Sequence, residues 1–135
     1  MSFQKVSYDS LNSRQRENFN FHKISAVLAD YGFTSIRLND DWQGADFIAQ
    51  HVDGERFLKI QLKGRLTIDK KYIGKGLYIT FPHKESWYLY PHDELVQHLL
   101  SSSNIGNTDS WVNSGGYSFN SLSRELLQHI EQYKL

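Results

Sequence analysis

Apolar positions follow a helical period in the first third of the chain and a two-residue period after it. Between Asn12 and Tyr31 they recur at spacings of three and four residues with no Gly or Pro, which predicts an amphipathic helix. Asn12 followed by Gln15 fits a capping box, and Gly32 is a typical C-cap. The expected buried stripe of this helix consists of Phe21, Ile24, Leu28 and Tyr31.

The pattern after Gly32 predicts strands. Residues 33–38 form a first strand, and a hairpin follows that begins near Ala45 and ends at Gly64. Its turn, residues 51–55, contains Asp53-Gly54, a pair that readily supplies the positive φ of a tight hairpin. The second strand alternates, so that one face carries Leu58, Ile60 and Leu62 and the other carries Lys59, Gln61 and Lys63.

The remaining pattern predicts two more strands and two helices. The strands cover residues 77–81 and 87–90, with a turn over 82–86. One helix starts at Pro91 and reaches Leu100, and residues 101–118, rich in Ser, Asn and Gly, form a loop around Trp111. A last helix over 121–134 has an apolar face of Leu122, Leu126, Ile130 and Tyr133. The predicted fold class is α/β (α+β), built around one mixed central sheet.

Composition narrows the class of protein. A chain of 135 residues with 39% apolar residues is expected to form one domain with one core. There is no cysteine, hence no disulfide framework and no thiolate metal site. No apolar run approaches the ~20 residues of a membrane span, and the first residues lack the apolar core of a signal peptide, so we expect a cytoplasmic protein. The zero net charge gives no global attraction to nucleic acid.

The hairpin also carries the candidate chemistry. Asp46 stands on its first strand, and Gln61 and Lys63 stand on its second, separated by one residue. An acid on one strand and an amide, a spacer and a lysine on the next can converge on one divalent metal ion. Trp42, in the turn before the hairpin, is expected to anchor the core.

These residues resemble the PD-(D/E)XK nuclease superfamily. Ala45-Asp46 stands where that family has Pro-Asp, and Gln61-Leu62-Lys63 stands for its (D/E)XK half, with the glutamine found in several branches. The resemblance covers roughly residues 12–95, where it implies the family's αβββ core. We therefore expect one PD-(D/E)XK-like domain over residues 1–135, with 96–135 as a C-terminal helical extension.

The resemblance implies a nuclease that hydrolyses phosphodiester bonds of DNA with Mg²⁺ or Mn²⁺. The expected metal ligands are Asp46, the side-chain oxygen of Gln61 and the main-chain carbonyl of Leu62, because Mg²⁺ prefers oxygen ligands. Lys63 would orient the attacking water and offset charge on the phosphate. An amide at 61 makes the site one negative charge poorer than the acid version, so weaker metal affinity is expected.

The first helix offers a further acid. The superfamily often adds an acidic residue from this helix, and Glu17 is its only glutamate, with Asn20 one turn further on the same face. Either residue could hold a water at the site. The other interpretation makes Glu17 an exposed first-turn acid that the helix dipole favours.

One basic segment follows the motif. It could track a nucleic-acid backbone, with its tyrosine available to stack on a base or bond a phosphate, or it could be a solvated loop. It comprises Arg65, Lys70, Lys71, Tyr72 and Lys75.

The sequence thus favours a metal-dependent deoxyribonuclease of the restriction, homing or junction-resolving type. Two alternatives stay open. A degenerate relative could bind nucleic acid without cutting it, which Gln61 and the neutral net charge favour, or the hairpin and aromatic residues could bind another protein. Cutting both strands of a duplex would require two sites, and hence a homodimer.

Overall fold

The computed structural model describes residues 1–135, and its first long helix begins as the sequence predicts. After a single 3₁₀ turn (Tyr8–Ser10), α1 runs from Ser13 to Ala29. Asn12 accepts a hydrogen bond from the Gln15 amide, and the Gln15 side chain accepts one from the Asn12 amide, both at 2.9 Å. This is the predicted capping box. Tyr31 lies beyond the helix end and is exposed, so the predicted stripe is wrong at that residue.

Five strands form the main sheet, in the spatial order β1-β2-β3-β5-β6. All neighbours are antiparallel except β3 and β5, so the sheet is mixed, and the predicted α+β fold is confirmed. The strand bounds are β1 Phe33–Trp42, β2 Ala45–His51, β3 Phe57–Leu62, β5 Leu77–His83 and β6 Ser86–Pro91. The predicted turn over 82–86 is shorter than expected, because β5 continues through Pro82 and only Lys84 and Glu85 have positive φ.

The C-terminal third holds more structure than predicted. Helix α2 (His92–Ser102) and helix α3 (Arg124–Ile130) flank short helical turns at Ile105–Asn107 and Ser110–Ser114, and a 3₁₀ turn (Glu131–Tyr133) follows α3. Strand β7 (Gly116–Ser118) pairs with β4 (Thr67–Asp69) in a second, two-stranded sheet. A 3₁₀ turn, Lys70–Tyr72, comes directly after β4. The expected loop over 101–118 therefore contains two helical turns and a strand.

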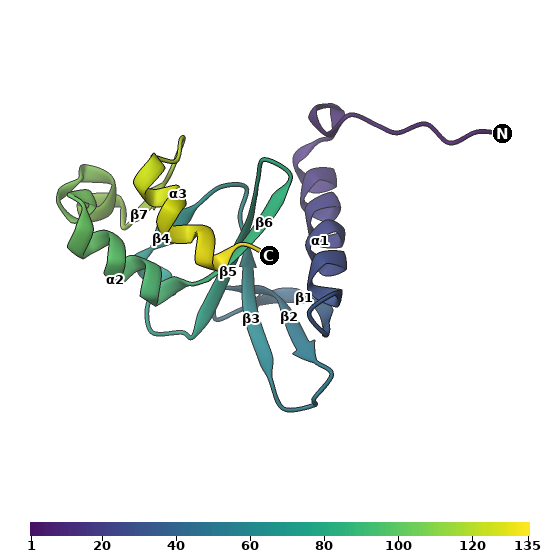
Figure 1. Cartoon of the computed structure of the whole chain (residues 1–135), viewed down its shortest axis with the longest axis horizontal. Helices are drawn as coiled ribbons and strands as arrows, with labels where there is room; N and C mark the ends of the chain where they lie inside the picture. Colours follow the sequence, from purple (N-terminus) through teal and green to yellow (C-terminus); the bar gives the residue numbers. More distant parts are fainter.

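Helices cover the main sheet on both faces, as Figure 1 shows, with α1 on one side and α2 and α3 on the other. Alternation in β2 and β3 directs Phe47, Ala49 and Ile60 towards α1, where they pack with Ile24 and Leu28. The opposite face of β5 and β6 carries a larger core beneath α2 and α3. That core includes Leu77, Ile79, Phe81, Tyr88, Tyr90, Leu95, Leu99, Leu126 and Ile130.

Coverage of this second face is incomplete. Where the face continues over β1, β2 and β3, the large side chains of Ile36, Trp42 and Phe57 are exposed. The prediction that Trp42 anchors the core is therefore wrong. No helix has both the length and the apolar character needed to cross a membrane.

Candidate active site

Strands β2 and β3 separate at the position of the motif. Their ladder runs from Gln50 and Phe57 to Phe47 and Ile60 and ends there. A continued ladder would set Asp46 opposite Gln61, but the pairing of β2 with β3 stops before these two residues, while β2 still pairs with β1 at Ala45 and Trp42. The amide of Leu62 therefore donates to Asp46 Oδ2, at 2.9 Å, in place of a backbone carbonyl.

Two of the motif side chains, Gln61 and Lys63, lie on the same side of β3 by alternation. The paired ladder ends before Asp46, and the hydrogen bond from the Leu62 amide links Asp46 to β3. Gln61 points away from α1, because its neighbours Ile60 and Leu62 pack towards that helix. Asp46 and Lys63 lie at the margin of the sheet, where each lines a hollow together with Glu17 of α1. The carboxylate, the amide and the ammonium thus come from adjacent strands at the point where the strands diverge.

The oxygen atoms at this point fit a small divalent cation. Gln61 Oε1 is buried and has no hydrogen-bond partner, an arrangement that costs about 1–3 kcal/mol when nothing binds the atom. The N–H and C=O of one strand residue point to the same side, so the carbonyl of Leu62 is directed to the gap beside Asp46. A carboxylate, an amide oxygen and a main-chain carbonyl form an all-oxygen set of the kind that Mg²⁺ accepts.

Burial raises the pKa of Asp46 above its usual value. The hydrogen bond from the Leu62 amide opposes this shift, Glu17 and Asp41 raise the pKa further, and Lys63 lowers it. Because protonation removes the negative charge, a proton competes with any cation for Asp46. The chain has no cluster of three His, Cys, Asp or Glu side chains that could hold a metal ion, so a cation here would depend on Asp46 and on neutral oxygens.

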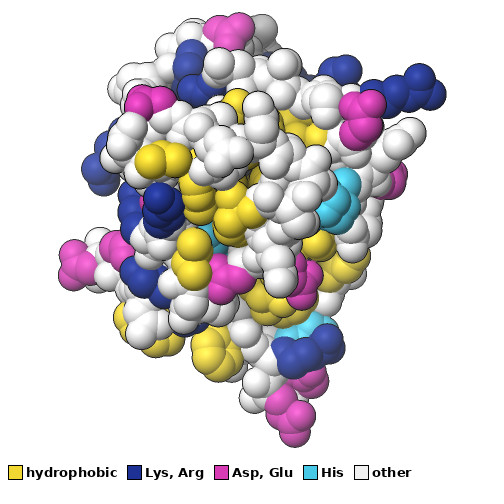
Figure 2. Space-filling model, turned by 90° about the vertical axis from the view of Figure 1, so that its left-hand side faces the viewer, with side chains coloured by type: hydrophobic (Ala, Val, Ile, Leu, Met, Phe, Trp, Pro, Cys, Tyr) yellow, Lys and Arg dark blue, Asp and Glu magenta, His cyan; other side chains and the backbone are white.

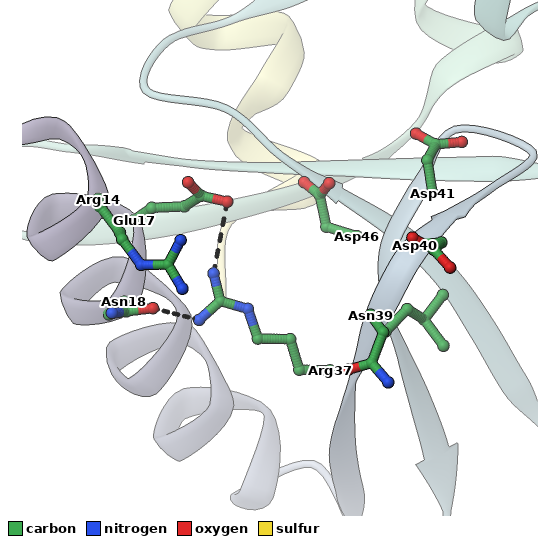
Figure 3. A pocket seen from close by; sticks show the side chains of 9 residues that line it. Arg14, Glu17, Asn18, Arg37, Asn39, Asp40, Asp41 and Asp46 are labelled. Carbon is green, nitrogen blue, oxygen red and sulfur yellow. Dashed lines mark hydrogen bonds and ion pairs between the residues drawn. The ribbon is translucent and has the colours of Figure 1, made fainter.

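A hollow of about 440 Å³ opens in front of Asp46. Figure 3 shows Asp46 between Glu17 on α1 and Asp41 on β1. Arg37 crosses the hollow and pairs with Glu17 at 3.4 Å, and it also donates to the side chain of Asn18. The lining residues are Arg14, Glu17, Asn18, Arg37, Leu38, Asn39, Asp40, Asp41 and Asp46.

Glu17 lines two hollows of the site, the one in front of Asp46 and the one at Lys63. The second hollow, of about 410 Å³, is also lined by Asn20. Asn20 is buried and donates to the hydroxyl of Tyr8 at 3.0 Å, so its amide nitrogen is already engaged. Of the two residues considered on α1, Glu17 has the exposed carboxylate, and Arg37 holds it over the site.

Tyr72 supports the site from below. Its residue is only 4% exposed, and its ring meets the His92 ring edge to face. Lys63 Nζ lies 5.6 Å from the ring centroid. Burial raises the pKa of Tyr72, as do Asp69 and Asp46, while Lys71 lowers it. The expectation that Tyr72 stacks on a base does not fit this position, because a buried ring offers no free face.

The other basic residues predicted to contact nucleic acid are held by different elements. Lys70 Nζ lies 5.3 Å from the Trp111 ring, Lys71 pairs with Asp69 at 4.0 Å, and Arg65 donates to Asn120. Lys75 is half-buried. Figure 2 shows Lys and Arg side chains along one flank of the α2–α3 side, beside exposed hydrophobic atoms. A contact of these residues with nucleic acid stays a prediction.

The sequence analysis did not identify two arginines that line the hollow, Arg14 and Arg37. Arg37 could have been identified from the sequence, because it is the one charged residue within the first predicted strand, Phe33–Leu38. The hydrophobic periodicity gave no indication that Gly44 matters to the site. This glycine has φ +90°, and a Cβ there would lie 2.9 Å from the Tyr72 ring, so a residue with a side chain would disturb the support beneath the site.

Comparison with known proteins finds a similarity at the level of structure. No protein-family model and no curated protein matches the chain. The fold is similar to that of Hjc, a Holliday junction resolvase from the archaeal hyperthermophile Archaeoglobus fulgidus, with 18% identity, 56% of this chain and 72% of that chain covered, and a TM-score of 0.44. The likeness is one of fold over part of each chain.

Proposed function

We propose that the protein is a metal-dependent nuclease that hydrolyses phosphodiester bonds of DNA at the site formed by Asp46, Gln61, Leu62 and Lys63. The observation that carries the proposal is the hydrogen bond from the Leu62 amide to Asp46 Oδ2, which sets the carboxylate beside the Gln61-Leu62-Lys63 segment where β2 and β3 separate. The buried Gln61 side-chain oxygen has no hydrogen-bond partner, so a bound cation would satisfy it.

Asp46, Gln61 and the Leu62 carbonyl would hold Mg²⁺ or Mn²⁺. The bound cation would supply Lewis-acid polarisation of a phosphoryl oxygen and neutralise charge that develops in the transition state. Lys63, as an ammonium group on the same face, would orient the attacking water and offset phosphate charge. Glu17, held by Arg37, lies where its carboxylate could accept a proton from that water, since it lines the hollows of both Asp46 and Lys63.

Two observations favour a second function. The chain lacks a cluster of three His, Cys, Asp or Glu side chains able to hold a metal ion, and position 61 carries an amide. A relative that binds nucleic acid through the same face without cutting it would need no high-affinity cation. Arg14 and Arg37 in the hollow would then serve as phosphate contacts.

The test measures cleavage of plasmid, duplex, single-stranded and four-way-junction DNA with Mg²⁺, with Mn²⁺ and with chelator. Asp46→Asn and Lys63→Ala should each lower the rate at least ~100-fold, the size expected for loss of a group that handles a proton or its charge. Lys5→Ala, a lysine in the exposed N-terminal segment, is the matched control and should leave the rate unchanged. Equal cleavage by wild type and both site variants would move the chemistry elsewhere.

Gln61→Glu separates the two functions. In a nuclease the added carboxylate should retain or raise activity and tighten Mn²⁺ binding, because it strengthens a hard-cation site. In a protein that only binds nucleic acid, the same change should weaken binding by putting a negative charge beside a phosphate. Binding at two salt concentrations shows whether phosphates are contacted. If the wild type neither cuts nor binds nucleic acid, both functions are excluded.

A further inference from the structure

The tip of the β1–β2 hairpin holds an aromatic ring beside the candidate site. The chain turns through Gln43, which has φ +54°, and Gly44, whose amide donates to Asp41 Oδ1 at 2.7 Å. Lys59 of β3 donates to Gln43 Oε1 at 2.8 Å, and its Nζ lies 5.4 Å from the centroid of the Trp42 ring. The turn and the lysine together hold the indole in one position.

Trp42 is the most exposed of the three tryptophans. Its residue is 46% exposed, whereas Trp111 is buried and Trp87 is partly buried against the α1 side. An indole loses hydrophobic stabilisation when it stays in water, and burial of an aromatic ring removes some 150–250 Å² from solvent. Lys59 takes up part of the ring surface, and the rest of the ring is open.

The ring lies close to the proposed chemistry. Lys59 stands on the same face of β3 as Gln61, two residues away, which is a distance of about 7 Å along a strand. Asp41, the neighbour of Trp42, lines the hollow in front of Asp46 together with Arg14 and Arg37. A nucleic acid whose phosphate reached Asp46 would therefore bring its next base or two within reach of the indole.

We propose that Trp42 is a stacking platform for an unpaired base, and that the substrate class is consequently single-stranded or branched DNA with unpaired bases rather than continuous duplex. The inference rests on the proposed function, because it takes the phosphate to lie at Asp46. Base–aromatic stacking stabilises single-strand complexes and tolerates any base. In a continuous duplex every base face is already stacked on its neighbours, so the indole gains nothing unless a base is unstacked at a cost of a few kcal/mol.

The cation at the ring favours nucleic acid over protein as the occupant. Lys59 beside the ring can meet a phosphate while the indole meets the base. The adjoining hollow contains Arg14 and Arg37 but also four carboxylates, so the preference for nucleic acid rests on Lys59. The same sheet face also carries the aliphatic side chains of Ile36 and Ile48, which are paired across β1 and β2. A second copy of the chain on these residues is the rival occupant, and the test below includes it.

The experiment measures binding of the intact chain, with chelator present to prevent cleavage. The probes are a labelled 20-nucleotide oligo(dT), a four-way junction with an unpaired centre, and a 20-base-pair duplex. Trp42→Ala should weaken binding of oligo(dT) and of the junction about 5- to 100-fold and change duplex binding less than about twofold. Trp42→Phe, which keeps an aromatic face, should retain most of the affinity. Oligo(dT) should also quench tryptophan fluorescence in wild type and not in Trp42→Phe.

Phe57→Ala is the matched control, because Phe57 is an exposed aromatic residue on the same face of β3, four residues from Gln61. It should leave the affinity for oligo(dT) unchanged. An equal loss in Phe57→Ala and Trp42→Ala, or an equal loss for duplex and oligo(dT), overturns the stacking role. A shift of Trp42→Ala from dimer to monomer in sedimentation, with unchanged DNA affinity, assigns the ring to the second copy and overturns it as well.

Failure of this inference can be told from failure of the proposed function. Metal-dependent cleavage with DNA affinity that ignores Trp42 leaves the nuclease standing and removes the stacking platform. Trp42-dependent binding of oligo(dT) by a protein that never cuts retains the platform and replaces the nuclease with the non-cutting relative. Absence of all DNA binding removes both.

Discussion

One face of the main sheet has two very different halves. Over β5 and β6 it is covered by α2 and α3 and forms the larger core, whereas over β3 it carries the partly exposed Gln61 and Lys63, with Asp46 of β2 beside them. The boundary runs between two parallel neighbours, because Gln61 pairs with Ile79, which is fully buried. Two residues paired across adjacent strands thus differ in their surroundings, since Ile79 lies in the core beneath the helices and Gln61 is partly exposed. The cover, rather than the strand pattern, decides where a polar site can exist.

The boundary itself is built from buried polar groups that are satisfied. The Tyr90 hydroxyl donates to the Thr67 carbonyl at 2.5 Å and accepts from the Thr67 amide at 3.1 Å. His92 Nε2 accepts from the Asp69 amide at 3.0 Å, and burial lowers the pKa of His92, which keeps it a neutral acceptor. These bonds attach β4 to the sheet, and Tyr72 follows directly after β4. The covered half therefore fixes the residue that underlies the candidate site.

The largest effect is expected in the covered half. Phe81 is 1% exposed and packs against both Tyr88 and Tyr90. Phe81→Ala removes these contacts and leaves a cavity, which should lower the free energy of unfolding by about 3–5 kcal/mol. Urea denaturation followed by circular dichroism measures the loss. A loss below about 1 kcal/mol would contradict the description of this half as a tightly packed core.

A smaller loss is expected at the boundary. Tyr90→Phe keeps the ring but leaves the amide and the carbonyl of Thr67 without their partner, which should cost about 1–3 kcal/mol. Hydrogen exchange at the Thr67 amide should accelerate in the variant. Tyr31→Phe, at an exposed tyrosine, is the control and should change neither stability nor exchange. Unchanged protection at Thr67 in Tyr90→Phe would show that β4 is held by other contacts.

A substitution at Asp46 should raise the stability of the protein, whereas the two substitutions above lower it. Because the pKa of Asp46 is raised in the folded protein, its contribution to stability is present at low pH and is lost as pH rises through the folded-state pKa. Asp46→Asn keeps an oxygen for the Leu62 amide and removes the charge, so it should raise the urea midpoint at pH 7. The difference from wild type should vanish as pH falls towards the ordinary carboxyl pKa.

Divalent cations sharpen the same comparison. Mg²⁺ should stabilise the wild type increasingly as pH rises, since deprotonation of Asp46 frees the carboxylate, and should do little for Asp46→Asn. Thermal midpoints with and without Mg²⁺ between pH 5 and pH 8 measure both trends. A variant less stable than wild type at pH 7 would mean that the carboxylate is a structural group.

The smallest effect is expected on the uncovered surface of β1. Ile36 is 49% exposed and lies on the same sheet face as the core of the covered half. Ile36→Ala should change the free energy of unfolding by about 0.5 kcal/mol or less, as is usual for surface sites. Urea denaturation of Ile36→Ala and Phe81→Ala under the same conditions compares the two losses of stability directly. A loss of several kcal/mol at Ile36 would mean that a second molecule covers it in solution.

The sequence by itself determined the local features of this protein. The capping box at Asn12, the alternation in β3 and the short turn after β2 are all set by residues close together in the chain. Since a hairpin turn fixes register, these features also brought the start of β2, with Asp46, next to the end of β3, with Leu62.

Tertiary structure decided the rest, because periodicity reports the geometry of one element and carries no information about what packs on it. Thr67 and Ser118 meet in the second sheet although they are 51 residues apart, so the local sequence pattern could not predict strand β7. Tyr72 is buried and Trp42 exposed for the same reason: the helices that cover the sheet reach the first and stop short of the second. The raised pKa of Asp46 likewise depends on neighbours from α1 and β1, which only the folded chain brings to β2.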